Sequence, residues 1–226
     1  MTRFVITSAG RDGSTMLVSM LDQHPQIKCE WELLGWEHWR SKQDRYARQL
    51  DLIRDFFEQP CPPAVRALGF KLIVHQGRLG HQHEIREYLR SLGVSVIHIR
   101  RRNLLCKYCS HLIAKQTGRW QISSPDQQSC QTVKIDPTEA MAYFRCSLED
   151  YRRNEAEFAK CRSLTICYEQ LSADAETIMQ RVFALLGVPD HSVCPQTCRQ
   201  ERRPLREVVE NLDEVGRGCA GIFPDK

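Results

Sequence analysis

Short apolar runs rich in β-branched residues alternate along this chain with stretches that have helical spacing, and this alternation limits the fold more than any other feature. Strands are predicted at Arg3–Ser8, Leu68–Val74, Val94–Ile99 and Leu164–Cys167. The stretches with helical spacing are residues 14–23, His83–Leu92, Leu104–Lys115, Ala140–Cys161 and Glu176–Leu186. Because strands that alternate with helices normally pair in parallel and are covered by those helices, we expect an α/β fold with a central, mainly parallel sheet.

The size and composition are those of one globular unit. The chain has 226 residues, of which 42% are hydrophobic and 27% charged, and it has no internal repeat or linker, so residues 1–226 are expected to form a single domain. The 32 basic and 28 acidic residues leave a modest net charge of +4, which argues against a dedicated nucleic-acid-binding protein. No apolar run approaches the roughly 18 residues of a membrane-spanning helix, and the opening segment resembles a buried strand, not a signal peptide. We therefore expect no membrane span and a cytoplasmic location.

The eleven cysteines are expected to be reduced thiols. Cys106 and Cys109 stand three residues apart in a helical stretch, and Cys194 and Cys198 flank a proline, but neither pair is repeated with the regular spacing of a zinc site. A disulfide framework is typical of shorter, secreted chains. We therefore expect neither disulfides nor a bound metal.

The first predicted strand leads into a turn with the composition of an anion site. Residues 8–15 read Ser-Ala-Gly-Arg-Asp-Gly-Ser-Thr and end where the first helix begins. Free backbone N–H groups and the positive end of a helix dipole favour an oxyanion there, Ser14 and Thr15 add hydroxyl donors, and Arg11 adds a cation. A nucleotide-hydrolysing P-loop would need a lysine directly after Gly13, and none is present. For this segment alone, an ordinary turn with an N-cap serine explains the residues equally well.

A second candidate anion site follows the strand Val94–Ile99. This strand runs into Arg100-Arg101-Arg102-Asn103, and Ser110 lies eight residues after Arg102 on the next helix. Open parallel sheets bind ligands in the crevice outside the carboxyl ends of their strands, where an arginine and a hydroxyl can share one anion. The alternative for three adjacent arginines is a solvated basic turn. Two anion sites on neighbouring strand–helix units point to a nucleotide with phosphates at both ends of its sugar.

These motifs resemble those of the sulfotransferase family. The stretch SAGRDGSTML resembles the family's 5′-phosphosulfate loop, with Arg11 where many cytosolic members have lysine, and Arg102-Asn103 with Ser110 resembles its 3′-phosphate motif. Residues 164–189, 69–72 and 202–215 resemble further family segments, the last two from the bacterial branch that modifies carbohydrates and small natural products. The resemblance implies a P-loop-kinase-like three-layer α/β fold, the donor 3′-phosphoadenosine 5′-phosphosulfate and no metal. The donor-binding residues it implies are Arg11, Asp12, Gly13, Ser14, Thr15, Arg102 and Ser110.

Sulfuryl transfer needs a base that removes the proton of the acceptor and groups that neutralise the charge on the transferred group and the leaving phosphate. Arg11 and Ser14 suit the second task. The resemblance aligns Glu32 best with the glutamate that acts as the family's base, and Glu30 is the rival carboxylate. His75, after the second predicted strand, is a third candidate, and a glutamate that only caps or solvates a helix start is the alternative for Glu32.

Arginines near the carboxyl end of the chain are further candidates. Arg199, Arg202 and Arg203 precede a predicted helix at 204–212, and we expect one of them, with Arg199 as the candidate, to meet the 3′-phosphate or the acceptor.

The acceptor is expected to be a hydroxyl or amine of a carbohydrate or small natural product. Its pocket is assigned to variable loops at 35–65 and 116–136, with Trp31, Trp36 and Trp39 available for stacking. Two other functions compete with this interpretation. A small-molecule kinase would share the fold but lacks the P-loop lysine, and a non-catalytic nucleotide-binding module would not need Glu32 and Arg11.

Overall fold

The centre of the molecule is a sheet of five parallel strands in the order β2-β3-β1-β4-β5. The computed structural model describes residues 1–35, 42–73, 82–122, 124, 126, 130–197, 201 and 203–219. The strands are β1 Thr2–Ser8, β2 Ile27–Glu30, β3 Ala67–Ile73, β4 Ser95–Arg100 and β5 Ser163–Cys167. The predicted α/β fold with a parallel central sheet is therefore confirmed.

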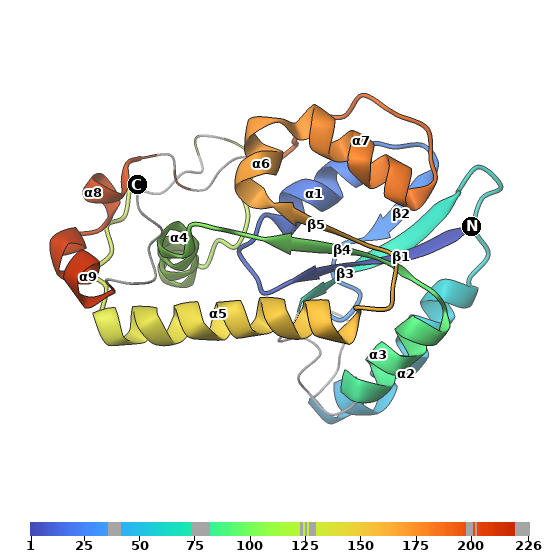
Figure 1. The fold of residues 1–226 in the computed structure, drawn as a ribbon, viewed down its shortest axis with the longest axis horizontal. Helices are drawn as coiled ribbons and strands as arrows, with labels where there is room; N and C mark the ends of the chain where they lie inside the picture. Colours follow the sequence, from blue (N-terminus) through green and yellow to red (C-terminus); the bar gives the residue numbers. More distant parts are fainter. Residues whose placement is uncertain are drawn as a thin grey trace.

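Helices cover both faces of this sheet and form a three-layer structure. They are α1 Ser14–Leu21, α2 Lys42–Glu58, α3 Gln82–Ser91, α4 Leu104–Thr117, α5 Pro137–Glu157, α6 Tyr168–Ala173, α7 Ala175–Leu186, α8 Leu205–Val208 and α9 Leu212–Gly218. Figure 1 shows α1, α6 and α7 on one face of the sheet and α2, α3 and α5 on the other. None of the helices in the described ranges is long and apolar enough to cross a bilayer.

The alternation of side chains along each strand explains the two layers of core. On β1, Phe4 and Ile6 pack with residues of α1 and α7, whereas Val5 packs with residues of α2 and α3. On β4, Ile97 and Ile99 belong to the first of these cores and Val96 to the second. Strands that are buried on both faces read as continuous apolar runs, which is why the sequence pattern located them.

A third apolar cluster lies beyond the carboxyl ends of the strands, where α4, α5, α8 and α9 meet (Figure 1). The segment before α5 is joined to the one after α8, because the backbone N–H of Val133 donates to the carbonyl of Val208 at 2.8 Å. The Asn211 side chain bonds both the N–H and the carbonyl of Ile135. These contacts fix a wall beside the carboxyl edge of the sheet.

Three regions differ from the sequence prediction. β2 was not predicted, because only Ile27 and Cys29 of its four residues are buried and the run is too short to show a pattern. Within the predicted loop at 35–65, residues 42–58 form α2, whose Ile53, Phe56 and Phe57 are buried in the core. The helix predicted at 204–212 is interrupted at Val209, which pairs with Val133 in an isolated β-bridge, and α8 and α9 lie on either side.

Candidate functional site

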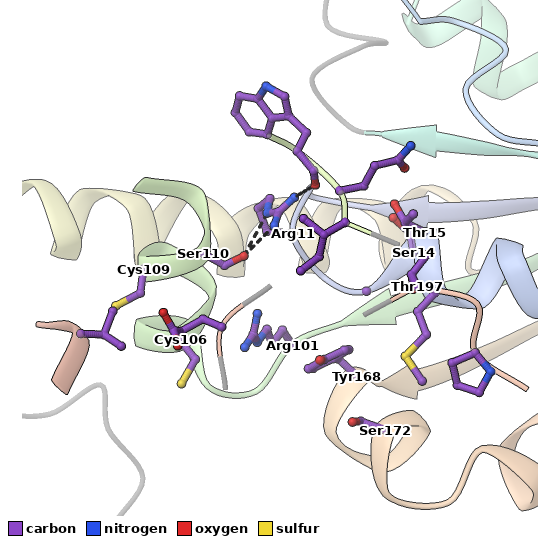
Figure 2. Close-up of a pocket in the computed structure, with 18 of the residues that line it drawn as sticks. Arg11, Ser14, Thr15, Arg101, Cys106, Cys109, Ser110, Tyr168, Ser172 and Thr197 are labelled. Atoms are coloured by element: carbon purple, nitrogen blue, oxygen red, sulfur yellow. Dashed lines mark hydrogen bonds between the residues drawn. The ribbon is translucent and has the colours of Figure 1, made fainter. Parts of the chain in front are cut away.

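A cavity of about 300 Å³ opens at the carboxyl edge of the sheet. It lies between the turn after β1, the start and body of α4, and the first turn of α6 (Figure 2). Its polar lining is contributed mainly by Arg11, Ser14, Thr15, Arg101, Ser110, Tyr168, Ser172, Thr197, Glu201 and Arg203. Residues from both predicted anion sites thus line one cavity, namely Arg11, Ser14 and Thr15 from the first and Ser110 from the second.

The turn from β1 to α1 is shaped to present backbone N–H groups. Gly10, Arg11 and Gly13 all have positive φ angles, of 84°, 58° and 87°, and Arg11 is the one described non-glycine residue in this conformation. Helix α1 begins after Gly13 without a side-chain cap and without an acidic residue in its first turn. An uncapped helix start with adjacent hydroxyls, here those of Ser14 and Thr15, is a site for an oxyanion.

Gly13 also has to be glycine because of a neighbour. A Cβ atom at this position would lie 2.3 Å from Cδ2 of Tyr168. The ring of Tyr168 thus packs directly against the turn, and its other contact is the guanidinium of Arg101, 4.7 Å from the ring centroid. The first residue of α6 therefore links the two turns.

Arg11 lies in the centre of the cavity and points toward α4 (Figure 2). Its Nε and Nη2 donate to Oγ of Ser110 at 3.1 and 2.7 Å, and its Nη1 donates to the carbonyl of Trp120. Burial lowers the pKa of Arg11 to about 10. Arginine at this position thus keeps its charge at neutral pH despite its desolvation, which lowers the pKa of any buried cation.

Asp12 does not line the cavity. Its carboxylate is fully buried on the opposite side of the turn, where it pairs with Nζ of Lys107 at 2.8 Å and accepts from the Tyr151 hydroxyl. It also accepts from the N–H of Ala9 at 2.8 Å. The Asp12 side chain therefore stabilises the turn and does not line the cavity.

The turn from β4 to α4 is closed by the protein's own groups. The carboxylate of Glu169 accepts from the backbone N–H of Arg102 at 3.1 Å and of Asn103 at 3.0 Å. The side chain of Asn103 caps α4 by accepting from the N–H of Cys106. The N–H groups of Arg102 and Asn103 are therefore not available to an anion at this turn.

Arg101 is the arginine that this turn brings into the cavity. Its Nε is buried and has no hydrogen-bond partner in the part of the chain that the structure describes. Arg102, the residue singled out from the sequence, has an exposed side chain and does not line the cavity, whereas Ser110 does. A period of two along β4 could have distinguished the arginines, because Arg101 continues the face of Ile97 and Ile99 that packs toward α1.

Arg203 lines the far end of the cavity. It pairs with Glu201 at 2.6 Å, and its guanidinium donates to the carbonyls of Cys130 and Gln131. Arg199 and Arg202 lie outside the described residues.

Glu32 lies at the same edge of the sheet, on the other side of β1. Glu30 is the last residue of β2 that pairs with β3, and its partner is Phe70. Glu32 comes two residues later and therefore lies level with the end of β3. Its Oε1 is 2.7 Å from Nζ of Lys71, whose side chain is buried, while that of Glu32 is 32% exposed. Residues 36–41 and His75 lie outside the described ranges.

Ten cysteines are described, and all ten are free thiols. No group of three or more His, Cys, Asp or Glu side chains able to hold a metal occurs within the described ranges.

Comparisons of the whole chain with known proteins show which proteins it is similar to. No family model matches the sequence. The chain is 31% identical to nodulation protein H of Rhizobium tropici, over 96% of this chain and 89% of that protein. It is 28% identical to nodulation protein H of Rhizobium meliloti, over 94% and 89% of the two chains.

Two solved structures share the fold. A sulfotransferase from Alicyclobacillus acidocaldarius superposes with a TM-score of 0.56 at 17% identity, over 97% of this chain and 93% of that one. A sulfotransferase domain from the curacin biosynthetic pathway superposes with a TM-score of 0.51 at 15% identity, over 84% and 76% of the two chains.

The parallel sheet is the fold that this chain shares with these sulfotransferases, and that fold defines its class. The chain belongs to the nodulation protein H family. The sulfotransferase class and the P-loop-kinase-like fold expected from the sequence are thereby confirmed.

Proposed function

We propose that the protein transfers a sulfuryl group from 3′-phosphoadenosine 5′-phosphosulfate to a hydroxyl or amine of a carbohydrate or small natural product. The observation that carries this proposal is one cavity with two cationic sites, each an arginine beside hydroxyl groups. Arg11, Ser14 and Thr15 come from the turn after β1 and the start of α1, and Arg101 and Ser110 come from the turn after β4 and from α4.

Each of the two anionic ends of the donor is assigned to one group of these residues. Its 5′-phosphosulfate is assigned to the uncapped start of α1, because free backbone N–H groups at a helix start favour an oxyanion and Arg11 lines the same cavity. Its 3′-phosphate is assigned to Arg101 and Ser110, since the buried Nε of Arg101 otherwise lacks a partner within the described ranges. Such an atom is costly to leave unpaired, and a phosphate oxygen would satisfy it.

The reaction we propose is an in-line displacement. The acceptor oxygen or nitrogen forms a bond to sulfur as the bond from sulfur to the bridging phosphate oxygen breaks, and adenosine 3′,5′-bisphosphate leaves. Arg11 and the N–H groups of the turn stabilise the charge that develops on the leaving phosphate. In the structure the Arg11 guanidinium is hydrogen-bonded to Ser110, so in this proposal its side chain changes rotamer when the donor binds.

Glu32 is the base in this proposal. It lies at the carboxyl edge of the sheet, two strands away from β1, and neighbouring strands are about 4.8 Å apart. The two strand spacings amount to about 9.6 Å, a gap that the Glu32 side chain, the acceptor and the sulfuryl group would fill together. The ammonium of Lys71 holds the carboxylate in place without blocking it, since about a third of the Glu32 side chain is exposed. Lys71 is a positioning residue here.

The test is the pair of variants Glu32→Gln and Glu30→Gln. Glutamine keeps the size of the side chain and removes the proton acceptor, so Glu32→Gln should lower kcat by about 10²–10⁴ while the affinity for adenosine 3′,5′-bisphosphate stays unchanged. Glu30→Gln, on β2, is the matched control and should keep most of its activity. A dead Glu30→Gln with an active Glu32→Gln would move the base by two residues, and full activity of both would make His75 the leading candidate.

We also propose that the enzyme works in the cytoplasm with free thiols and no metal. Titration of the denatured protein without reductant should then count close to eleven thiols, and chelator should leave turnover unchanged. Stoichiometric zinc in the purified protein would contradict this part of the proposal.

A further inference from the structure

The turn that receives the anionic donor contains an anion of its own. Asp12 stands between Arg11 and Gly13, and its side chain is fully buried. It accepts hydrogen bonds from the N–H of Ala9 and the hydroxyl of Ser8, at 2.8 and 3.2 Å, which draws the turn back onto the end of β1. A carboxylate in this position shapes the turn, but its charge opposes the binding of a phosphosulfate a few ångströms away.

Lys107 supplies the opposite charge. Its side chain is as completely buried as that of Asp12, and Nζ lies 2.8 Å from Oδ1 of the carboxylate. It reaches the turn from α4, the helix that also carries Ser110 one turn further on. Burial lowers the pKa of Lys107, and the adjacent carboxylate opposes this change.

The Tyr151 hydroxyl completes the cluster and connects it to the second turn. It donates to Asp12 and accepts from Nζ of Lys107 at 2.8 Å. It also accepts from the backbone N–H of Arg101 at 3.2 Å. The cluster therefore contacts both turns that form the cavity, the first through Asp12 and the second through Arg101.

We propose that Lys107 is a positioning residue for the donor, which neutralises Asp12 and thereby lets a turn with an internal carboxylate accept a second anion. The proposal rests on the proposed function, because it assumes that the cavity binds the sulfuryl donor. Lys107 does not line the cavity, so its effect is transmitted through Asp12 and Tyr151. Removing one member of a buried ion pair leaves the other charge without compensation.

The charged and titratable groups around the pair come from three elements. The groups that act on Asp12 or Lys107 are Arg11 in the first turn, Arg101 in the second, and Tyr143, Asp150 and Tyr151 on α5. Burial and the charge of Asp12 both raise the pKa of Tyr143 and Tyr151, so both phenols stay neutral across the range from pH 5.5 to 8.5 used below.

The test measures the affinity for adenosine 3′,5′-bisphosphate by calorimetry between pH 5.5 and 8.5. In Lys107→Met the carboxylate of Asp12 has no cation, so its charge repels the nucleotide and we expect at least about a tenfold loss of affinity at pH 8. Burial then favours the protonated carboxyl, which no longer repels the ligand. The affinity of the variant should therefore recover as the pH falls, and binding should be accompanied by proton uptake that the wild type does not show.

Two control variants separate charge from packing. In Asp12→Asn with Lys107→Met both charges are gone, so the affinity should lie within about fivefold of the wild type and show no added pH dependence. Tyr151→Phe removes a hydroxyl and no charge, and should give a small loss that is equal at all pH values. If Lys107→Met does not fold, as thermal unfolding would reveal, recovery of folding and affinity in the double variant carries the same conclusion.

Equal and pH-independent losses in Lys107→Met and in the double variant would overturn the proposal, because they would show that only packing matters. Unchanged affinity in Lys107→Met would overturn it as well. A wild type that does not bind the nucleotide at all would instead contradict the proposed function, so the two failures are distinguishable.

Discussion

The turns after β1 and after β4 both contribute residues to the cavity, but they differ in whether their backbone N–H groups are already bonded. After β1 the start of α1 has no side-chain cap, and Gly13, Ser14 and Thr15 line the cavity. After β4 the corresponding N–H groups of Arg102 and Asn103 are occupied by the carboxylate of Glu169. The first helix start is thus left uncapped, whereas two N–H groups of the second turn are already bonded to a carboxylate.

This difference explains which residues are restricted at each turn. Where the backbone binds, conformation matters, and the first turn needs positive φ at three of four consecutive residues, 10, 11 and 13. Where side chains bind, it matters which face of the sheet each side chain points to. Arg101 lines the cavity because it continues the alternation of side chains along β4. The comparison yields three tests, given from the largest expected effect to the smallest.

Gly13→Ala should abolish donor binding. The new Cβ would lie 2.3 Å from the ring of Tyr168, and φ of 87° is itself unfavourable for alanine, so we expect a loss of about 2–5 kcal/mol in unfolding free energy. Gly118→Ala is the matched control, because it has a similar φ of 69° with nothing within 4 Å of the added Cβ. It should cost only about 1 kcal/mol and leave donor affinity intact. Thermal unfolding and calorimetry measure both, and equal effects of the two variants would contradict the close contact with Tyr168.

Arg11→Ala should weaken donor binding and turnover together, since the proposed mechanism has the guanidinium contact the phosphosulfate in both the ground and the transition state. We expect kcat to fall by about 10²–10³ and nucleotide affinity by about tenfold or more. Initial rates at saturating acceptor test this, with Lys115→Ala, an exposed cation on the same helix as Ser110, as the control. Normal kcat with reduced affinity alone would restrict Arg11 to binding.

Glu169→Gln should have the smallest effect. The amide keeps an acceptor for the N–H groups at the start of α4 but loses the charge, so stability should fall by about 1 kcal/mol, which is a shift in Tm of roughly 2–4 °C. Affinity for adenosine 3′,5′-bisphosphate should change by less than about fivefold. A loss as large as that of Arg11→Ala would show that the start of α4 contributes to ligand binding after all.

The first turn, the buried strands and the class could be predicted from the sequence, whereas contacts between distant residues could not. Residues 8–15 are contiguous, so their composition alone identified the loop, and the apolar runs of buried strands identified the fold. The partners of Asp12 and Glu32 could not be found this way, because Lys107 and Lys71 are 95 and 39 residues away in sequence and meet them only through the fold. One signal was available for Lys107, since a lysine within the largely apolar stretch Leu104–Ala114 needs a buried partner.

The choice between Arg101 and Arg102 shows the same limit. The spacing of eight residues to Ser110 favours Arg102, whereas the alternation along β4 favours Arg101, and only the placement of the strand between its two cores decides which side chain faces the cavity.

The most direct measurement of this account is the binding of adenosine 3′,5′-bisphosphate and of AMP to the wild type, Arg101→Ala and Arg102→Ala by calorimetry. We expect the wild type to bind the bisphosphate more tightly than AMP by about 1.5–3 kcal/mol, the worth of a charge-assisted contact to the 3′-phosphate. Arg101→Ala should lose most of this difference, and Arg102→Ala should retain it. Equal binding of the two nucleotides by the wild type, or loss of the difference in Arg102→Ala alone, would contradict the assignment of the 3′-phosphate to the side chain of Arg101.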